Sequence, residues 1–362
     1  MPKKYEAVLN DILDKINNGQ YKLDSLLPTE KYFTDYYNVS RITVQKAMNI
    51  LVQEGVIERI AGKGSFVKKV PTGSGETGSK NMYAIVLPFQ ELETLTIIKG
   101  VQEVLDEKNN YLTVHFTEYD NLKEIEIIKK LLDNNINNII FYPLYSNLSV
   151  DFCKKIIQDG ANIVFIDKEM TDFHADAVLA DNFDGSYKAT KFMIEKGHRN
   201  IAYLTYSYNW GTSLLERTNG FKKCMSDNGL WNENVIVRSD ITCQQDVPSV
   251  LSDVLESDKD LTAIMCSTDA LAKEVLYYLK SHNYSVPDDI SLMGFDNSII
   301  AQTVRPKLAT VSQDFLEIGR CAARLLIYKE KNPSANLHKI LIPTKVVDRA
   351  SVKNLCTDTS PV

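Results

Sequence analysis

The chain has 362 residues, of which 44% are hydrophobic and 24% are charged, and its net charge at pH 7 is −6. This length allows two or three domains, and the composition excludes a disordered or fibrous protein. No apolar run reaches membrane-spanning length, and the amphipathic, acid-containing N-terminus is neither a signal nor a transit peptide. We therefore expect a cytoplasmic protein with no membrane partner.

The distribution of charge and the spacing of the cysteines further restrict the class of protein. Residues 1–70 carry 11 Lys and Arg against 8 Asp and Glu, whereas the remainder carries 30 against 39. A mildly basic N-terminal region on an acidic body favours a protein that meets nucleic acid through that region alone. The six cysteines lack C-x-x-C spacing and nearby His, which predicts reduced packing cysteines. We expect no metal and no cofactor.

The first predicted element is an amphipathic helix over residues 4–18, with apolar side chains at helical spacing. A short helix follows from Pro28 to about Tyr37, and a turn at residues 38–39 ends it. Ser40 then stands in an N-cap position, where its hydroxyl accepts a backbone N–H of the next helix.

The next helix is expected from Arg41 to about Glu54, ended by Gly55 as a C′ glycine. Its buried stripe at helical spacing comprises Val44, Ala47, Met48 and Leu51. Its outward side chains are cationic or able to donate and accept hydrogen bonds: Arg41, Thr43, Gln45, Lys46 and Asn49. Two strands over residues 56–60 and 65–69 complete a hairpin with a basic tip.

A helix, a turn, a second helix and a hairpin make a winged helix-turn-helix, which places one helix in a DNA groove. The stretches LPTEKYFTDYYNVSRITVQKAM and EGVIERIAGKGSFV resemble the DNA-binding domain of the GntR family of bacterial regulators, over about residues 3–69. The resemblance implies DNA contacts from Thr29, Glu30, Ser40, Arg41, Thr43, Gln45, Lys46 and Lys63. The family often has Arg where this chain has Gln45, so this base contact is expected to differ. The alternative is a helix-turn-helix inside an unrelated helical domain. It does not explain why the predicted hairpin follows the second helix in register.

Residues 71–81 are rich in Pro, Gly, Ser and Thr and predict a flexible linker between a domain at 1–70 and a domain at 82–350, with a tail at 351–362. From Met82 onward, short apolar runs alternate with helical segments, which indicates a parallel α/β fold. The expected strands are 82–88, 112–117, 138–143, 162–167, 200–205, 262–267 and 290–295. Two consecutive blocks predict two Rossmann-like lobes, with a ligand site beyond the carboxyl ends of the strands, in the cleft between the lobes.

Several motifs in this second region resemble the effector domain of the LacI family over about residues 82–350. They are VLADNFDGSYKATKFMIEKGHRNIAYL, ERTNGF, TAIMCSTDALA, VPDDISLMGFDN and KLATVSQDFLEIGRCAARLL. The resemblance implies a type I periplasmic-binding-protein-like fold that binds a sugar. A GntR-type head on a LacI-type body is similar to the arabinose-repressor group of low-GC Gram-positive bacteria, so arabinose is the first candidate. The short hinge helix of the LacI family is not visible, and the linker stands in its place.

Recognition of a sugar requires planar polar groups for vicinal hydroxyls and an aromatic plate for an apolar face. The LacI resemblance implies ligand contacts from Asp167, Arg217, Thr268, Asp269 and Asp296. Thr268 stands where that family usually has Asn, so ligand preference is expected to differ. Position after a strand or in a strand-end loop adds Phe89, Glu91, Tyr145, Lys168 and Trp210.

Structural alternatives remain open for these residues. Arg217 and Asp296 could simply pair with each other across the cleft, and Asp269 could be only the N-cap of a helix over residues 270–282. The aromatic side chains at 89, 145 and 210 could pack rather than stack on a ligand.

The sequence thus favours a ligand-responsive regulator, a repressor of carbohydrate genes that binds pseudo-palindromic operator DNA as a homodimer and is released by a small sugar. The alternative is a sugar- or nucleotide-dependent enzyme on a doubly wound fold. Against it, no G-x-G-x-x-G follows the first strand, and neither a P-loop nor a G-x-S-x-G elbow is present. We expect no catalytic residues.

Overall fold

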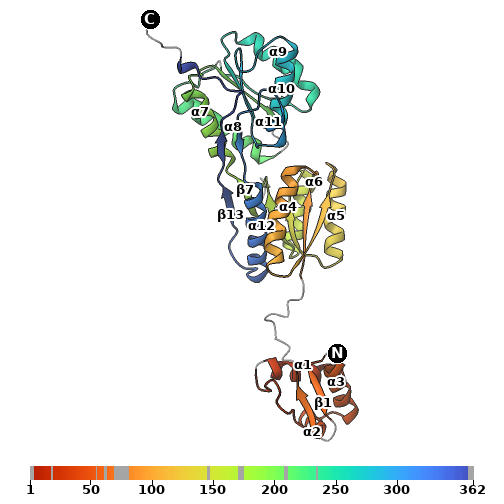
Figure 1. Cartoon of the computed structure of the whole chain (residues 1–362). Coiled ribbons are helices and arrows are strands. Elements are labelled where there is room, and N and C mark those ends of the chain that lie inside the picture. The colour runs from red at the N-terminus through yellow and green to blue at the C-terminus, as the bar shows by residue number, and fades with distance from the viewer. Residues whose placement is uncertain are drawn as a thin grey trace. The chain divides into compact units, whose positions relative to one another are not determined.

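The computed structural model describes residues 4–17, 19–53, 55–60, 63–68, 81–144, 147–169, 175–207, 211–233 and 235–357. The chain divides into two units, Met1–Asn81 and Met82–Val362, and each is described by itself (Figure 1). The predicted linker lies outside the described residues except for Asn81, as do the last five residues of the predicted tail.

The first unit is a winged helix-turn-helix, as the sequence predicts. Helices α1 (Lys4–Asn17), α2 (Glu30–Tyr37) and α3 (Arg41–Gln53) precede an antiparallel hairpin of β1 (Ile57–Ile60) and β2 (Gly64–Val67). All of these elements contribute to one core, which comprises Val8, Ile12, Ile16, Leu27, Phe33, Val44, Ala47, Met48, Leu51, Val56, Ile57 and Val67. The four residues of the predicted stripe on α3 are all in it.

Hydrogen bonds and backbone angles confirm Ser40 as the N-cap of α3 and the turn after α2, whereas α2 begins at Glu30 and not at Pro28, because Thr29 is its N-cap. Ser40 Oγ accepts the backbone N–H of Thr43 at 3.3 Å, and Thr29 Oγ1 accepts that of Tyr32 at 3.2 Å. Asn38 and Gly55, which end α2 and α3, have φ angles of +51° and +67°. Each cap satisfies a backbone group that the helix itself leaves unpaired.

The first lobe of the second unit is built on a six-stranded parallel sheet in the order β13-β7-β6-β5-β3-β4. Its strands are β3 (Met82–Leu87), β4 (Tyr111–Phe116), β5 (Asn138–Phe141), β6 (Asn162–Ile166), β7 (Asp176–Ala180) and β13 (Lys339–Ile342). Helices α4 (Leu92–Asp106) and α12 (Phe315–Lys331) cover one face. Helices α5 (Asn121–Asp133) and α6 (Asn147–Gln158) cover the other.

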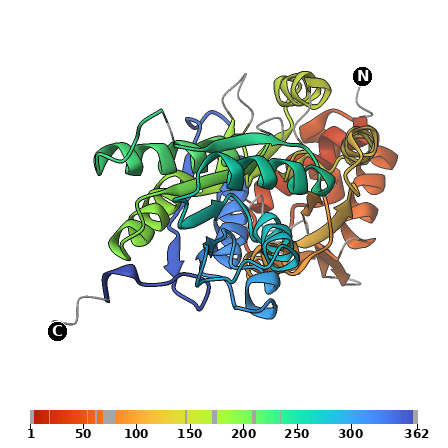
Figure 2. The same cartoon turned by 90° about the horizontal axis from the view of Figure 1, so that it is seen from above.

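The second lobe has a four-stranded parallel sheet in the order β11-β10-β8-β9. These strands are β8 (Ile201–Tyr206), β9 (Val237–Ile241), β10 (Ala263–Cys266) and β11 (Ser291–Met293). Helices α7 (Asn182–Glu195) and α8 (Thr212–Asp227) pack on one face, and α9 (Val247–Ser257) and α10 (Asp269–Ser281) on the other, as the view from above also shows (Figure 2). A short helix α11 (Ile299–Thr303) and an antiparallel pair, β12 (Thr310–Ser312) and β14 (Lys345–Val347), complete the lobe.

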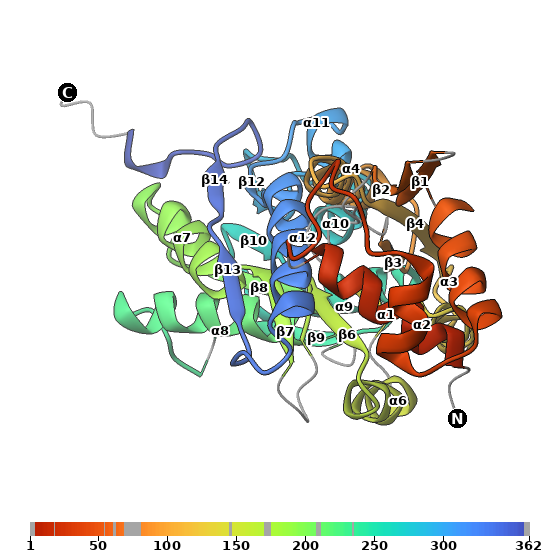
Figure 3. The same cartoon turned by 90° about the horizontal axis from the view of Figure 1, so that it is seen from below.

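The expectation of two consecutive blocks needs a correction, because the chain passes between the lobes three times. It crosses after β7, returns after β12 to form α12 and β13 in the first lobe, and crosses again before β14. Figure 3 shows α12 and β13 beside β7. Close packing of α12 on α4 requires glycine, because a Cβ at Gly319 would lie 2.2 Å from the carbonyl oxygen of Ile97.

None of the described helices combines the length and the apolar character needed to cross a membrane.

Candidate functional site

The exposed face of α3 carries the side chains that the sequence assigns to DNA. The Arg41 side chain is 75% exposed, and Lys46 is exposed with its Nζ 4.0 Å from the centroid of the Tyr5 ring. Thr43 Oγ1 lies 2.8 Å from Ser40 Oγ, so the two hydroxyls share a hydrogen bond at the start of the helix. Lys63, directly before β2, is exposed. The face therefore offers cations and hydroxyls together, which suits a phosphate backbone beside base edges.

Glu30, at the start of α2, organises the polar side chains of this face. Its carboxylate accepts Gln45 Nε2 at 3.2 Å and Arg59 Nη2 at 2.8 Å, and it lies 3.6 Å from Arg41 Nε. Arg59, on β1, also donates to Asn49 Oδ1 at 3.0 Å. Sequence reasoning missed Arg59, because the alternation of a two-stranded wing does not reveal which helix lies against it.

The second unit contains a cavity of about 1060 Å³ between its lobes. Residues that follow the carboxyl ends of parallel strands line it from both sides, as expected for ligand sites in such sheets. Seven predicted residues are among them: Phe89, Glu91, Asp167, Lys168, Arg217, Thr268 and Asp296. Tyr145 and Trp210 lie outside the described residues.

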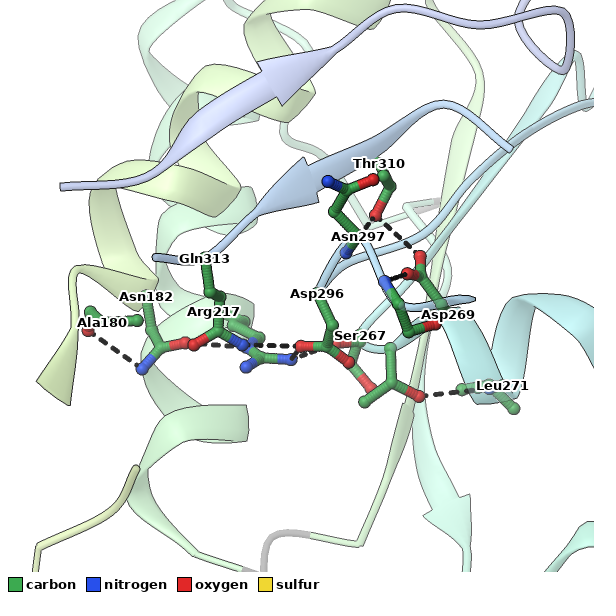
Figure 4. A network of polar contacts seen from close by, with 12 residues as sticks. Ala180, Asn182, Arg217, Ser267, Asp269, Leu271, Asp296, Asn297, Thr310 and Gln313 are labelled. Carbon is green, nitrogen blue, oxygen red and sulfur yellow. Dashed lines mark hydrogen bonds and ion pairs between the residues drawn. The ribbon is translucent and has the colours of Figure 1, made fainter. Parts of the chain in front are cut away.

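Arg217, on α8, is a firmly held charged group in the cavity wall. It is 3% exposed, and its guanidinium lies 3.8 Å from the centroid of the Phe295 ring. Its Nε donates to Asn182 Oδ1 at 2.8 Å, and its Nη1 donates to the Ser267 carbonyl at 2.6 Å and to Asp296 Oδ1 at 3.0 Å (Figure 4). These contacts from three segments of the second lobe fix the orientation of the guanidinium.

Asp296 follows β11 with a φ of +114°, a conformation rarely adopted by residues other than glycine. Its Oδ1 accepts from both Arg217 and Gln313, the latter at 2.7 Å (Figure 4). Within the described residues, its Oδ2 has no hydrogen-bond partner. Burial raises the pKa of Asp296, and the charge of Arg217 opposes this shift. The alternative that Arg217 and Asp296 pair with each other is therefore met, but the pair does not span the cleft, because both residues belong to the second lobe.

Thr268, and not Asp269, takes the N-cap position that the sequence offered to Asp269. Thr268 is the N-cap of α10, since its Oγ1 accepts the Leu271 N–H at 3.1 Å. The Asp269 side chain is fully buried and accepts from Thr310 Oγ1 at 2.7 Å and from the Ser298 N–H at 2.8 Å. Burial, followed by the nearby charge of Asp296, raises its pKa. Asp269 therefore positions two loops behind the cavity and is not placed for ligand contact.

The wall from the first lobe is mainly aromatic. Phe89 stacks on Tyr119 with ring centroids 5.4 Å apart and meets Tyr142 edge-to-face at 5.8 Å. These three residues, the aromatic trio, follow β3, β4 and β5. Lys168 Nζ lies 5.5 Å from the centroid of the Tyr142 ring, and burial lowers the pKa of Lys168. Asp167 has a φ of +66°, so both strand-end carboxylates of the cavity have left-handed backbones.

Three residues that line these walls, Tyr119, Tyr142 and Gln313, were not predicted from the sequence, and neither was Asn182, which holds Arg217 from behind. Tyr142 lies inside the predicted strand 138–143, whereas β5 ends at Phe141, so the strand-end rule applied to the longer strand selected Tyr145 instead. Asn182 and Gln313 had no such signal, because each lies where the chain crosses between lobes.

Comparison with known proteins agrees with this architecture. Residues 4–67 match the gntR family of bacterial regulatory proteins, and residues 190–352 match the periplasmic binding protein-like domain. The arabinose metabolism transcriptional repressor of Geobacillus stearothermophilus is 26% identical over 360 residues, which cover 97% of this chain and 98% of that protein. Its counterpart in Halalkalibacterium halodurans is 27% identical over 340 residues, 90% of this chain and 89% of that protein.

Solved structures of LacI-type regulators share the fold of the second unit. The transcription regulator CcpA of Lactococcus lactis superposes with a TM-score of 0.68 at 20% identity, over 76% of this chain and 100% of that one. A LacI family regulator from Enterococcus faecium with bound ribose gives 0.63 at 23% identity, over 75% and 99%. The first unit thus matches the helix-turn-helix domain of the gntR family, and the second unit matches the periplasmic binding protein-like domain over residues 190–352.

Proposed function

We propose that the protein is a ligand-responsive transcriptional regulator, a repressor of carbohydrate-utilisation genes that leaves its operator when it binds a small sugar. The observation that carries this proposal is the presence in one chain of two built sites. One is the exposed cationic face of a gntR-type α3, and the other is an interlobe cavity with one charged and one aromatic wall. Relatives that match nearly the whole chain and are named arabinose metabolism transcriptional repressors support the same function.

The two walls of the cavity match the two kinds of surface that a sugar presents. Asp296 Oδ2 accepts a hydroxyl, while Arg217 and Gln313 hold the carboxylate in place. The aromatic trio offers flat apolar rings for the C–H face of the sugar. Arabinose is the first candidate by its relatives, but a cavity of about 1060 Å³ also accommodates a disaccharide.

Coupling between the two sites follows from the position of the cavity. A ligand that touches both lobes favours one angle between them, and thereby one spacing of the two heads in a homodimer. Operator DNA favours another spacing, so each ligand weakens the binding of the other by the same factor. A repressor of this kind acts on a pseudo-palindromic operator in the cytoplasm.

The cavity carboxylates serve as acceptors rather than as an acid–base pair, so we propose that the protein catalyses no reaction. Asp296 is tied to Arg217, and Asp269 is enclosed behind the wall. Incubation of the pure protein with the identified sugar, followed by NMR of the recovered sugar, tests this point. Any hydrolysis, phosphorylation or oxidation product contradicts it.

The direct experiment is a fluorescence-anisotropy titration of the full-length protein on labelled DNA from upstream of its own gene. Pentoses, hexoses and disaccharides are then added singly. We expect tight, salt-sensitive binding and release by one sugar. Equal affinity for this DNA and for scrambled DNA, together with no release by any of the sugars, would contradict the proposal.

A further inference from the structure

The contact between Gln45 and Glu30 fixes which way the Gln45 amide faces. A carboxylate accepts hydrogen bonds and donates none, so the arm of the amide that meets Glu30 at 3.2 Å is the NH2 group. The carbonyl oxygen Oε1 is therefore the opposite arm. Within the described residues Oε1 has no hydrogen-bond partner, and one N–H of the same amide also remains for another acceptor.

Glu30 is itself held in place from several elements. Arg59 on the wing donates to Glu30 Oε1 at 2.8 Å, while Gln45 and Arg41 on α3 approach Oε2. Arg59 is further tied to Asn49 on α3 at 3.0 Å. The Glu30 side chain is only 23% exposed. These contacts from two other elements restrict its rotation, so the carboxylate is a fixed reference for the amide.

An amide in this orientation presents an acceptor beside a donor. The bases differ in whether their major-groove edges are complementary to that pair. Adenine offers a donor at N6 and an acceptor at N7 in the major groove, which matches both arms. Guanine offers two acceptors, O6 and N7, and leaves Oε1 of Gln45 facing an acceptor. Cytosine offers the N4 donor and satisfies only Oε1.

We propose that Gln45 reads an adenine in each operator half-site and that Glu30 is the positioning residue that makes this reading selective. The inference rests on the proposed function, because it requires α3 to enter the major groove. It deepens that function by naming one base of the operator. An Arg at position 45 reverses the preference, since its guanidinium donates to both acceptors of guanine.

The test is selection of bound sequences from a random double-stranded DNA library by the full-length wild type and by three variants. Gln45→Arg replaces the reader, and Glu30→Gln removes the obligate acceptor while keeping the size of the side chain. Gln53→Arg adds the same charge at an exposed position farther along α3 and serves as the matched control. Circular dichroism and thermal unfolding establish that each variant is folded.

We expect the wild type to enrich a two-fold symmetric sequence with an A·T pair at one position of each half. Gln45→Arg should change that position alone to G·C, with affinity for the wild-type site lower by about 5- to 150-fold. Glu30→Gln should lose the preference at that position, because its amide can pair with either arm of Gln45. Gln53→Arg should keep the wild-type sequence.

Three results would overturn the inference, and they are distinguishable. If Gln45→Arg enriches the same sequence as the wild type, Gln45 reads no base although operator recognition stands. If the preferred pair places guanine opposite Gln45, or if Glu30→Gln keeps full selectivity, the assigned amide orientation is wrong. If the folded wild type enriches no sequence at all, the proposed function fails and the inference falls with it.

Discussion

The two walls of the interlobe cavity differ in how firmly their side chains are held. On the second lobe, Arg217 and Asp296 are fixed by each other, by Gln313 and by Asn182. On the first lobe, the aromatic trio is held mainly by ring contacts among its members, with Lys168 beside the Tyr142 ring, and Tyr119 is 58% exposed. The charged wall is therefore organised before a ligand arrives, whereas the aromatic wall gains its contacts when a ligand lies against it.

This difference separates two contributions to recognition. Groups held in place lose little conformational freedom on binding, so the charged wall determines which hydroxyl arrangement is accepted. Apolar rings contribute affinity in proportion to the area that they bury and discriminate weakly between sugars. Changes in the charged wall should thus affect stability and binding together, and changes in the aromatic wall should affect binding alone.

The largest effect is expected from Arg217→Ala. It leaves the Asp296 carboxylate, the Asn182 amide and the Ser267 carbonyl without their partner in a buried place, which costs about 3–5 kcal/mol of unfolding free energy. Release of operator by the sugar should be abolished. Urea unfolding and the anisotropy titration measure the two effects.

Arg324→Ala is the matched control, because that arginine on α12 is 59% exposed and pairs with Glu317. It should cost less than about 1 kcal/mol and keep the response to sugar. An Arg217 variant that is stable and still releases DNA at the wild-type sugar concentration would place the effector elsewhere.

Lowering the pH should weaken effector binding through Asp296. Burial raises the pKa of this carboxyl to about 6, so it takes up a proton as the pH falls through that value, loses its ion pair and becomes a poorer acceptor. Affinity at pH 5 should be about tenfold below that at pH 7. Isothermal titration calorimetry at both pH values measures the change.

Asp296→Asn provides the control for this pH effect. It should bind weakly at both pH values and show little dependence on pH. The effect of pH on folding stability is opposite to its effect on effector binding. The reason is that the Asp296 carboxyl of the unfolded chain releases its proton at a lower pH than that of the folded chain. The contribution of Asp296 to stability should therefore decrease as the pH rises from about 4 to about 6.

A smaller effect is expected from Phe89→Ala in the aromatic wall. Loss of the ring should cost about 1 kcal/mol of effector binding, or about fivefold in Kd, with little change in sugar preference. Tyr277→Ala, at a site on α10 that is 54% exposed and outside the cavity lining, should leave Kd unchanged. Titration with two sugars decides the point, since a switch in preference would show that the aromatic wall also discriminates.

The smallest effect on binding is expected from Thr268→Ala. Its hydroxyl caps α10, so the change should lower the unfolding free energy by about 1 kcal/mol and leave effector affinity nearly intact. Thermal unfolding and calorimetry on the same sample separate the two. A large loss of affinity without loss of stability would show that Thr268 contacts the ligand directly.

Much of the first unit was predictable from sequence because its signals are local. The stripe Val44, Ala47, Met48 and Leu51 sets the buried side of α3, and Ser40 and Gly55 mark its ends within a turn of the helix. In the second unit, alternation of apolar runs with helices predicted the parallel sheets. The strand-end rule then placed Phe89, Asp167 and Asp296 at the cavity.

Only the tertiary structure decided what depends on contacts between distant segments. Hydrophobic periodicity shows which side of a strand faces inward, but it does not show which sheet the strand joins, so the return of α12 and β13 to the first lobe was not visible. The same limit applies to side chains. Asp269 and Asp296 both lie close after strands, yet one is enclosed by Thr310 and the other lines the cavity, because the fate of each depends on a loop far along the chain.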